Sequence, residues 1–318
     1  MWRLIDFMKK NKNTDEMSVG FITFEKHNGR KDIGSSTIRA EWLCNHWDNA
    51  EIFKQGRNYD VILFQKAYWV DMAKDFKGIK IFDICDADFL HWGYRTKEML
   101  VECDAVTTST EALAEQFRRF TDKPVVCIPD RIDLDLHNQK KLHKGRATHA
   151  VWYGYSDNFE MLDPVMYFLE KFGLDLIVIS NKPYLPQMNY VKPEIQKGMN
   201  INDTERILEM QKKKEHWVDV KNVKWTKETV DKDIISGDIV INPTKDAGKW
   251  KYKSNNKTIK SWALGLPVAS NTTELKLFLE EGARQKEVEK RQKEIKDKWD
   301  VKLSIEQYKK LFKKIQND

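Results

Sequence analysis

The chain has 318 residues and carries a net charge of +6 at neutral pH. Because this length exceeds the usual size of a single hydrophobic core, the sequence predicts two domains of about 150 residues each. It contains no run of about 18 apolar residues, so we expect no membrane span.

The N-terminus and the cysteines narrow the class of protein further. Most of the positive charge in the N-terminal stretch follows its apolar residues, which is not the pattern of a secretory signal. The four cysteines are scattered, with no CxxC pair and no histidine at metal-ligand spacing. We therefore expect reduced thiols in a cytoplasmic protein and no zinc site.

Lysines lie beside tryptophans in two segments, KKKEHWVDVKNVKW and KWKYK. Basic residues interleaved with aromatic ones are able to follow a phosphate backbone or stack on bases. No recognised nucleic-acid-binding module accompanies them. A nucleic-acid partner therefore stays open, beside the alternative that these lysines form a solvated surface.

The first predicted domain covers residues 1–138. Short apolar runs separated by helical patterns are typical of a parallel, doubly wound α/β sheet. The expected strands are Met17–Phe24, Tyr59–Gln65, Ile79–Cys85, Cys103–Ser109 and Pro124–Ile128. A helix is expected near Ile38, after a loop with Gly34, Ser35 and Ser36 whose backbone N–H groups could face a ligand. A flexible turn is an equal alternative, and the loop is not a GxGxxG fingerprint.

Acidic residues follow the third of these strands. Asp86 and Asp88 come directly after it, with His91 behind them. Because ligands bind at the carboxyl ends of parallel strands, we expect these residues to contact a transferred group or take a proton from a substrate hydroxyl. A free carboxylate titrates near pH ~4, so it acts as a base only if burial raises its pKa or through positioning. The alternative is that at least one of them caps the next helix.

The second predicted domain covers residues 139–285 and follows a polar, basic linker, Leu134–Ala147. Its expected strands are His149–Tyr153, Leu174–Ser180, Val220–Trp225, Asp238–Asn242 and Pro267–Ser270. Lys182 follows the second strand and is a candidate phosphate ligand, or simply a solvated cation. We expect a loop over Pro183–Asn200 and a helix over Asn202–Trp217.

The stretch from Asp238 to Asn271 carries the strongest functional signal. A basic loop precedes a helix, for which Ser254 is the expected N-cap, while Gly265 and Pro267 mark its end. The helix N-terminus, Lys253 and Lys257 would then converge on one anion, best matched by a diphosphate. The alternative is a solvated lysine-rich surface.

This stretch resembles the donor-binding segment of GT-B glycosyltransferases, closest to the large retaining, nucleotide-sugar-dependent (family 4-like) group. The matching residues are Pro243, Lys253, Ser254, Lys257, Ala263, Gly265, Pro267 and Val268. Cys103–Leu113 also matches the family motif D-x-V-x-x-S-x-x-x-L. One position differs: the family usually has a ribose-binding glutamate three residues after Lys257, and this chain has Lys260.

The resemblance implies two facing Rossmann-like domains, with the acceptor bound by the first and the donor by the second. It implies that Gly154 lets the backbone approach the donor and that Trp225 contacts the nucleotide base, with core packing as the alternative. It makes Arg39 a candidate phosphate or acceptor contact. Arg131, in PDRID where the family has Pro-Asn-Gly-hydrophobic-Asp, is a candidate cation in the cleft, with a surface ion pair to Asp133 as the alternative.

Residues 286–318 form a predicted C-terminal helical segment. Apolar residues recur there at helical spacing and indicate an amphipathic helix packed on a domain. These residues are Leu303, Ile305, Tyr308, Leu311, Phe312 and Ile315. In the family this helix returns to the N-terminal domain.

We therefore expect transfer of a sugar from a nucleotide-diphosphate sugar, with a UDP-sugar preferred, to an acceptor hydroxyl. The preferred acceptor, by a slight margin, is a hydroxymethylated pyrimidine in double-stranded bacteriophage DNA; a saccharide or lipid-linked glycan is the alternative. Lys260 also allows an inactive module that binds nucleotide or glycan. No cofactor beyond the donor and no metal is expected, and the Asp86-Ala87-Asp88 run is not interpreted as a metal site.

Overall fold

The computed structural model describes residues 12–29, 31–91, 93–185, 218–245 and 247–317. The chain divides into two compact units. The N-terminal unit contains Met1–Leu136, Lys245–Ile259 and Lys296–Asp318, and the C-terminal unit contains His137–Thr244 and Lys260–Ile295. The sequence placed residues 245–259 in the second domain, whereas the structure groups them with the first. None of the described helices combines the length and the apolar character that crossing a membrane requires.

The N-terminal unit is built on a six-stranded parallel sheet in the order β2-β1-β3-β4-β5-β6. Its strands are β1 (Val19–Ile22), β2 (Ala50–Ile52), β3 (Val61–Gln65), β4 (Ile79–Ile84), β5 (Ala105–Thr108) and β6 (Val125–Cys127). Its longer helices are α2 (Phe24–Asn28), α5 (Val70–Asp75), α6 (Gly93–Glu102), α7 (Glu111–Phe117) and α15 (Lys302–Asn317). Shorter helical segments are η1 (Thr14–Glu16), α3 (Gly34–Ser36), η2 (Thr37–Glu41), α4 (Trp42–Cys44), η3 (Asp88–Leu90) and η6 (Gly248–Tyr252).

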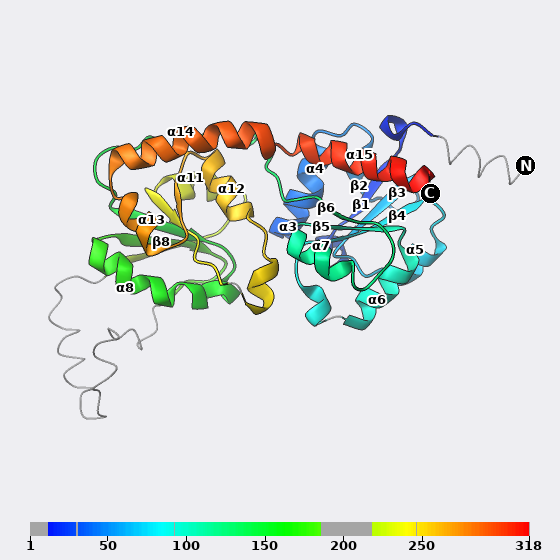
Figure 1. The fold of residues 1–318 in the computed structure, drawn as a ribbon, viewed down its shortest axis with the longest axis horizontal. Coiled ribbons are helices and arrows are strands. Elements are labelled where there is room, and N and C mark those ends of the chain that lie inside the picture. The colour runs from blue at the N-terminus through cyan, green and yellow to red at the C-terminus, as the bar shows by residue number, and fades with distance from the viewer. Residues whose placement is uncertain (1–11, 30, 92, 186–217, 246, 318) are drawn as a thin grey trace, which may run out of the picture. The chain divides into compact units, whose positions relative to one another are not determined.

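Helices cover both faces of this sheet (Figure 1). Because successive side chains of a strand point to opposite faces, Phe21 and Ile22 of β1 enter different cores. Ile22 packs in the cluster that contains α6 and α7 residues such as Met99 and Phe117. Phe21 lies edge-on to Trp47, at a centroid distance of 6.5 Å, on the face that α15 covers.

The C-terminal helix α15 returns to the N-terminal unit, as expected. Its residues Ile305, Tyr308, Leu311 and Phe312 are buried, which matches the predicted apolar stripe. Phe312 stacks on Trp47 with centroids 5.9 Å apart. Leu303, the first residue of the stripe, is instead 38% exposed.

The C-terminal unit contains a five-stranded parallel sheet in the order β11-β10-β7-β8-β9. Its strands are β7 (His149–Tyr153), β8 (Asp175–Ser180), β9 (Val220–Lys224), β10 (Ile239–Ile241) and β11 (Val268–Ala269). Its helices are η4 (Ser156–Met161), α8 (Asp163–Phe172), α11 (Val230–Ile235) and α13 (Thr272–Leu277). Helices α12 (Asn256–Ala263) and α14 (Glu281–Lys298) cross the boundary between the units.

Two apolar clusters cover the two faces of the second sheet. Residues of α8 and α13, including Leu169 and Leu275, pack with Trp152 on one face. Residues of α11 and the end of α12, including Ile234 and Leu264, pack with Val151 on the other. Val151 and Trp152 are neighbours in β7 and therefore point to opposite faces of the sheet, where they pack against different helices.

The predicted linker is packed against the C-terminal unit over part of its length. Arg284 is fully buried and donates to His143 Nδ1 at 3.1 Å and to the carbonyl of Gly145 at 2.6 Å. His143 Nε2 in turn lies 2.9 Å from the carbonyl of Gly265. The polar composition of Leu134–Ala147 predicted an interdomain linker. The buried contacts of His143 and Gly145 fix part of this linker to the C-terminal unit.

Two expected helix starts were wrong, each by a few residues. The helix expected near Ile38 begins at Gly34, so Gly34, Ser35 and Ser36 form its first turn rather than a loop. The helix expected at Ser254 begins at Asn256, because the hydroxyl of Ser254 is bound elsewhere. In the C-terminal unit, Ser156–Met161 form the 3₁₀ segment η4, and α8 begins at Asp163. The expected loop over Pro183–Asn200, beyond residue 185, and the helix over Asn202–Trp217 lie outside the described residues.

The packing of α15 predicts a large stability effect at Phe312. Phe312→Ala should lower the free energy of unfolding by about 3–5 kcal/mol, because it removes a fully buried ring and leaves a cavity. Urea unfolding followed by circular dichroism measures this. The neighbouring exposed Lys313 provides the control, since Lys313→Ala should change stability by no more than about 0.5 kcal/mol. A loss at Phe312 as small as that of the control would contradict the packing.

Candidate functional site

The candidate site lies at the carboxyl ends of β3 and β4 in the N-terminal unit. Lys66 directly follows β3, and Asp86 and Asp88 follow β4. Lys66 has a φ of +49°, a left-handed conformation that residues other than glycine seldom adopt. Such backbone strain is often found at functional sites.

The side chain of Lys66 bridges the two aspartates. Lys66 Nζ lies 2.6 Å from a carboxylate oxygen of Asp86 and 3.6 Å from one of Asp88. The lysine is buried and its ammonium also lies over the ring of Phe24, 4.6 Å from the centroid. Burial lowers the pKa of Lys66, but the carboxylates outweigh it and keep the side chain charged.

The two aspartates differ in their proton affinity. Burial raises the pKa of Asp88, and the neighbouring Asp86 charge adds to this. Burial also acts on Asp86, but Lys66 and Lys253 outweigh it and hold the pKa of Asp86 below its usual value. Tyr68 donates a hydrogen bond of 3.2 Å to Asp88. Asp88 is therefore the better proton acceptor of the two.

The third predicted member of this group, His91, is more exposed to solvent than the two aspartates. Its side chain is exposed, and its backbone closes the 3₁₀ turn η3 by a hydrogen bond to Asp88. The structure therefore brings Asp86 and Asp88 together at Lys66 and leaves His91 at the surface beside them.

The lysine-rich segment is anchored at the same edge of the sheet. Lys253 Nζ lies 2.6 Å from the second carboxylate oxygen of Asp86. The ring of Tyr252 contacts Phe89 with centroids 5.4 Å apart, and Thr110 donates to the carbonyl of Tyr252 at 3.4 Å. These contacts explain why residues 245–259 belong to the N-terminal unit.

Lys257 lies in the first turn of α12 and is partly buried. Burial lowers the pKa of Lys257 to about 8, and the positive charge of Lys253 contributes to the shift. The two positive charges repel each other, and an anion bound beside them and the helix N-terminus would relieve this repulsion. This arrangement supports the predicted cradle, although Ser254 takes no part as the N-cap.

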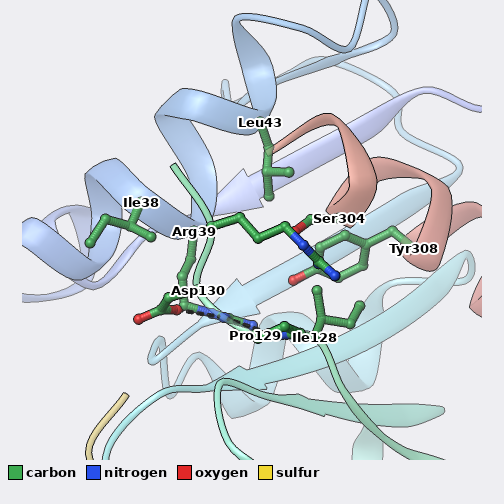
Figure 2. Close-up of a pocket in the computed structure, with 9 residues that line it drawn as sticks. Ile38, Arg39, Leu43, Ile128, Pro129, Asp130, Ser304 and Tyr308 are labelled. Carbon is green, nitrogen blue, oxygen red and sulfur yellow. Dashed lines mark hydrogen bonds and ion pairs between the residues drawn. The ribbon is translucent and has the colours of Figure 1, made fainter. Parts of the chain in front are cut away.

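Ser254 instead belongs to a buried ion network, whose Arg39–Asp130 pair is drawn in Figure 2. Its hydroxyl donates to Asp130 at 2.6 Å, and the other oxygen of Asp130 pairs with Arg39 at 2.8 Å. Arg39 also makes two bonds to Asp83, of 2.5 and 2.7 Å, and all three charged residues are at most 4% exposed. Tyr308 of α15 donates to Asp83 at 3.3 Å.

A small pocket lies beside this network (Figure 2). It is lined by Ile38, Arg39, Leu43, Ile128, Pro129, Asp130, Arg131, Ser304 and Tyr308. Arg39 was predicted to contact a phosphate or the acceptor. Its donors are instead committed to Asp83, Asp130 and the carbonyl of Ile128, so its visible role is structural.

Arg131 binds the C-terminal helices rather than Asp133. It donates to the carbonyl of Lys298 at 3.0 Å, to Ser304 at 2.9 Å and to Gln307 at 2.6 Å. The expectation of a cation in the cleft and the alternative of an ion pair with Asp133 both overlooked α15, which is distant in sequence. In the expected phosphate loop, the hydroxyl of Ser36 is buried and donates to Gln65 at 3.2 Å.

The remaining predicted residues belong to the C-terminal unit. Gly154 ends β7 with a φ of +154°, which favours glycine and fits close backbone approach by a ligand. Lys182 is exposed after β8. Trp225 is half-buried and packs against the α11 face of the sheet, which favours the core alternative over base stacking.

Lys260 forms an ion pair where the family has a glutamate. Its ammonium lies 2.7 Å from Asp231, and the other oxygen of Asp231 lies 2.5 Å from His137 Nδ1. Burial would raise the pKa of Asp231, but these two partners hold it below its usual value. A carboxylate is therefore present beside Lys260, supplied by α11.

Sequence reasoning missed Lys66 and Asp130. Lys66 directly follows an apolar strand and belongs to no recognised motif. Only its position after β3 could have suggested a role. Asp130 was noted merely as a departure from the family turn. Both act by contacts to residues more than 19 positions away, which no local pattern reveals.

Possible metal ligands were also considered among the described residues. Asp86 and Asp88, which have DxD spacing, share the ammonium of Lys66, a cation in the place that a metal would take. His46, Asp133 and Asp135 could bring ligand atoms within 4.8 Å of one another, but Lys302 already lies 3.2 Å from Asp135. A metal at either group would have to displace an ammonium that is already paired there.

Comparison with known proteins places the fold. No family model and no curated protein matches the chain. Among solved structures, AviGT4, a glycosyltransferase involved in avilamycin A biosynthesis, is 11% identical, with 95% of this chain and 98% of that chain covered and a TM-score of 0.52. Trehalose-6-phosphate synthase OtsA is also 11% identical, with 86% and 74% covered and a TM-score of 0.52.

A third likeness is to T4 phage BGT in complex with its UDP-glucose substrate, at 10% identity over 95% of this chain and 98% of that chain. Its TM-score of 0.47 is too low to establish a shared fold. At such identities the first two likenesses establish the fold alone. The expected α/β architecture of two parallel-sheet domains, as in GT-B glycosyltransferases, is confirmed.

The buried ion network predicts a large effect of removing one charge. Asp83→Asn should lower the free energy of unfolding by about 3–5 kcal/mol, because Arg39 is left buried with a weaker set of partners. Chemical denaturation measures this. The exposed Asp75 offers a matched control, and Asp75→Asn should leave stability within about 0.5 kcal/mol. Equal effects of the two substitutions would show that the network contributes no stability.

Proposed function

We propose that this protein is a glycosyltransferase that moves a sugar from a nucleoside-diphosphate sugar to an acceptor hydroxyl. The GT-B fold supports this class of reaction. The observation that carries the proposal is the placement of Lys253 and Lys257 at the N-terminus of α12, beside the Asp86–Asp88 pair. A UDP-sugar is the preferred donor, in keeping with the sequence resemblance.

The lysines and the helix N-terminus would act on the leaving diphosphate. Negative charge builds on this phosphate as the bond to the sugar breaks. Fixed cations placed there stabilise the transition state more than the ground state, and so accelerate the reaction. Lys253, Lys257 and the first N–H groups of α12 supply that charge, so the proposal requires no metal.

Asp88 is the proposed proton acceptor. Burial raises its pKa, and this brings the carboxylate closer to the value that suits a base near neutral pH. Asp86, held in its charged form by two lysines, would position Lys66 and Lys253. His91, exposed on the same segment, is a proposed acceptor contact.

For the acceptor we prefer a hydroxymethylated pyrimidine in double-stranded DNA, over a saccharide or lipid-linked glycan. The preference is slight and rests on lysines and a tryptophan in η6. Lys249 Nζ lies over the ring of Trp250 at 5.0 Å, and Lys251 follows. This basic and aromatic segment adjoins Lys253, so a polyanion bound to it would approach Asp86 and Asp88.

A second candidate function is a catalytically inactive module that binds nucleotide or glycan. Lys260 in place of the family glutamate favours it, because a lysine does not replace the carboxylate that accepts ribose hydrogen bonds. The ion pair of Lys260 with Asp231 keeps a carboxylate nearby, which favours an active enzyme. Release of nucleoside diphosphate in the presence of acceptor distinguishes the two functions.

The decisive test is a mass-spectrometric screen of nucleotide sugars against hydroxymethylated DNA and oligosaccharides. A mass increase of one sugar on an acceptor, with release of nucleoside diphosphate, is the expected result. Lys257→Met should reduce this turnover at least about tenfold, since one of the fixed cations is lost. Binding of nucleotide sugar without turnover on any acceptor would favour the inactive module.

The lowered pKa of Lys257 predicts that diphosphate binding depends on pH. In the free protein Lys257 loses its proton above about pH 8, and a bound anion would restore it. Binding should therefore be constant below this pH and weaken above it, by about tenfold between pH 7 and pH 9, with uptake of a proton. Calorimetric titration with UDP measures both quantities.

Lys257→Arg is the control for this pH dependence, because a guanidinium stays charged throughout the range. The arginine variant should bind UDP with the same affinity at both pH values. An unchanged pH dependence in the variant would assign the titration to another group.

Salt dependence tests the preferred acceptor. If DNA is the acceptor, its Michaelis constant should rise steeply with salt, because lysine–phosphate contacts release counterions. With about three such contacts, the constant should rise about 40-fold between 50 and 200 mM salt. A salt-independent constant for DNA, or turnover confined to oligosaccharides, would contradict the DNA preference.

A further inference from the structure

The site balances two carboxylates against two lysines. Asp86 accepts Lys66 on one oxygen and Lys253 on the other, each at 2.6 Å, and Asp88 shares Lys66. With Lys253 in place the four side chains sum to zero charge. Without it, two neighbouring carboxylates would share a single ammonium.

The two lysines differ in how firmly they are held. The side chain of Lys66 is only 9% exposed and lies between two carboxylates and an aromatic ring. The side chain of Lys253 is 44% exposed and comes from the loop between η6 and α12. Lys253 is therefore the partner that is able to leave, because its charge reaches water with little reorganisation.

We propose that Asp86 holds Lys253 in the place of the donor diphosphate, and that donor binding transfers Lys253 from Asp86 to the phosphate. The inference rests on the proposed function. Asp86 is then a positioning residue, an internal anion that competes with the substrate for the same cation.

The transfer of Lys253 would prepare the aspartate pair for the acceptor. The groups facing Asp86 are Lys66, Lys253, Asp88 and the thiol of Cys85, whose sulfur lies 3.9 Å away. Once Lys253 leaves, Asp86 and Asp88 share Lys66 alone, and two like charges so close raise the proton affinity of the pair. Donor binding therefore strengthens the base that Asp88 already provides, which favours binding of donor before acceptor.

The competition is measured by UDP binding to the full chain, by calorimetry at pH 7. Asp86→Asn should bind UDP about fivefold more tightly than the wild type, equivalent to about 1 kcal/mol, because the internal competitor is gone. Lys253→Met should bind UDP at least about tenfold more weakly. In the Lys253→Met background, Asp86→Asn should have no effect, and this loss of coupling is what a purely structural role of Asp86 would not produce.

Asp135→Asn is the matched control, since Asp135 pairs with Lys302 and the substitution changes the net charge equally. This variant should bind UDP as the wild type does. If Asp86→Asn does not fold, carboxyl NMR titration of wild type and Lys253→Met replaces it. UDP should raise the pKa of Asp86 in the wild type and leave it unchanged in Lys253→Met.

Three outcomes would overturn the inference, and they are distinguishable. Equal UDP affinity of wild type and Asp86→Asn, or an unaltered pKa of Asp86 on binding, rejects the competition but leaves the proposed function standing. A gain in Asp86→Asn that persists in the Lys253→Met background assigns the effect to net charge. If the wild type binds none of UDP, GDP and ADP, the proposed function fails, and the inference fails with it.

Discussion

Two carboxylates at the edge of the first sheet hold the lysine-rich segment in place. Asp86 binds Lys253 and Asp130 binds Ser254, so neighbouring residues of one loop are fixed by side chains that follow β4 and β6. Without these bonds nothing in the composition of the loop would keep lysines together, since like charges repel. The candidate anion site therefore depends on one ion pair and one hydrogen bond within the N-terminal unit.

The same edge shows how burial separates the roles of similar groups. Asp86 and Asp88 are two positions apart, yet one is held charged by two lysines and the other has its pKa raised by burial. Lys253 sets this difference, because it pairs with Asp86 alone, whereas the ammonium of Lys66 lies between both carboxylates. A base and a positioning group thus arise from one short segment.

The buried network of Arg39, Asp83 and Asp130 is the structural support for that edge. It joins β4, the π-helical turn η2 and the segment after β6, and Tyr308 extends it to α15. Such a network costs desolvation energy and is retained where every donor and acceptor is satisfied. Its link through Ser254 means that the lysine segment and the C-terminal helix are coupled to the same charges.

The sequence by itself determined the second parallel sheet, the first except for its edge strand β2, and the amphipathic α15, because apolar periodicity and helix-stop residues act locally. It also named Asp86 and Asp88 as catalytic candidates and Lys253 and Lys257 as donor-binding candidates. Only the tertiary structure decided that Arg39 and Arg131 are internal ligands and that Lys66 belongs to the site. The reason is physical: a charged side chain takes its role from its partners, and Gln307, a partner of Arg131, lies 176 positions away in the chain.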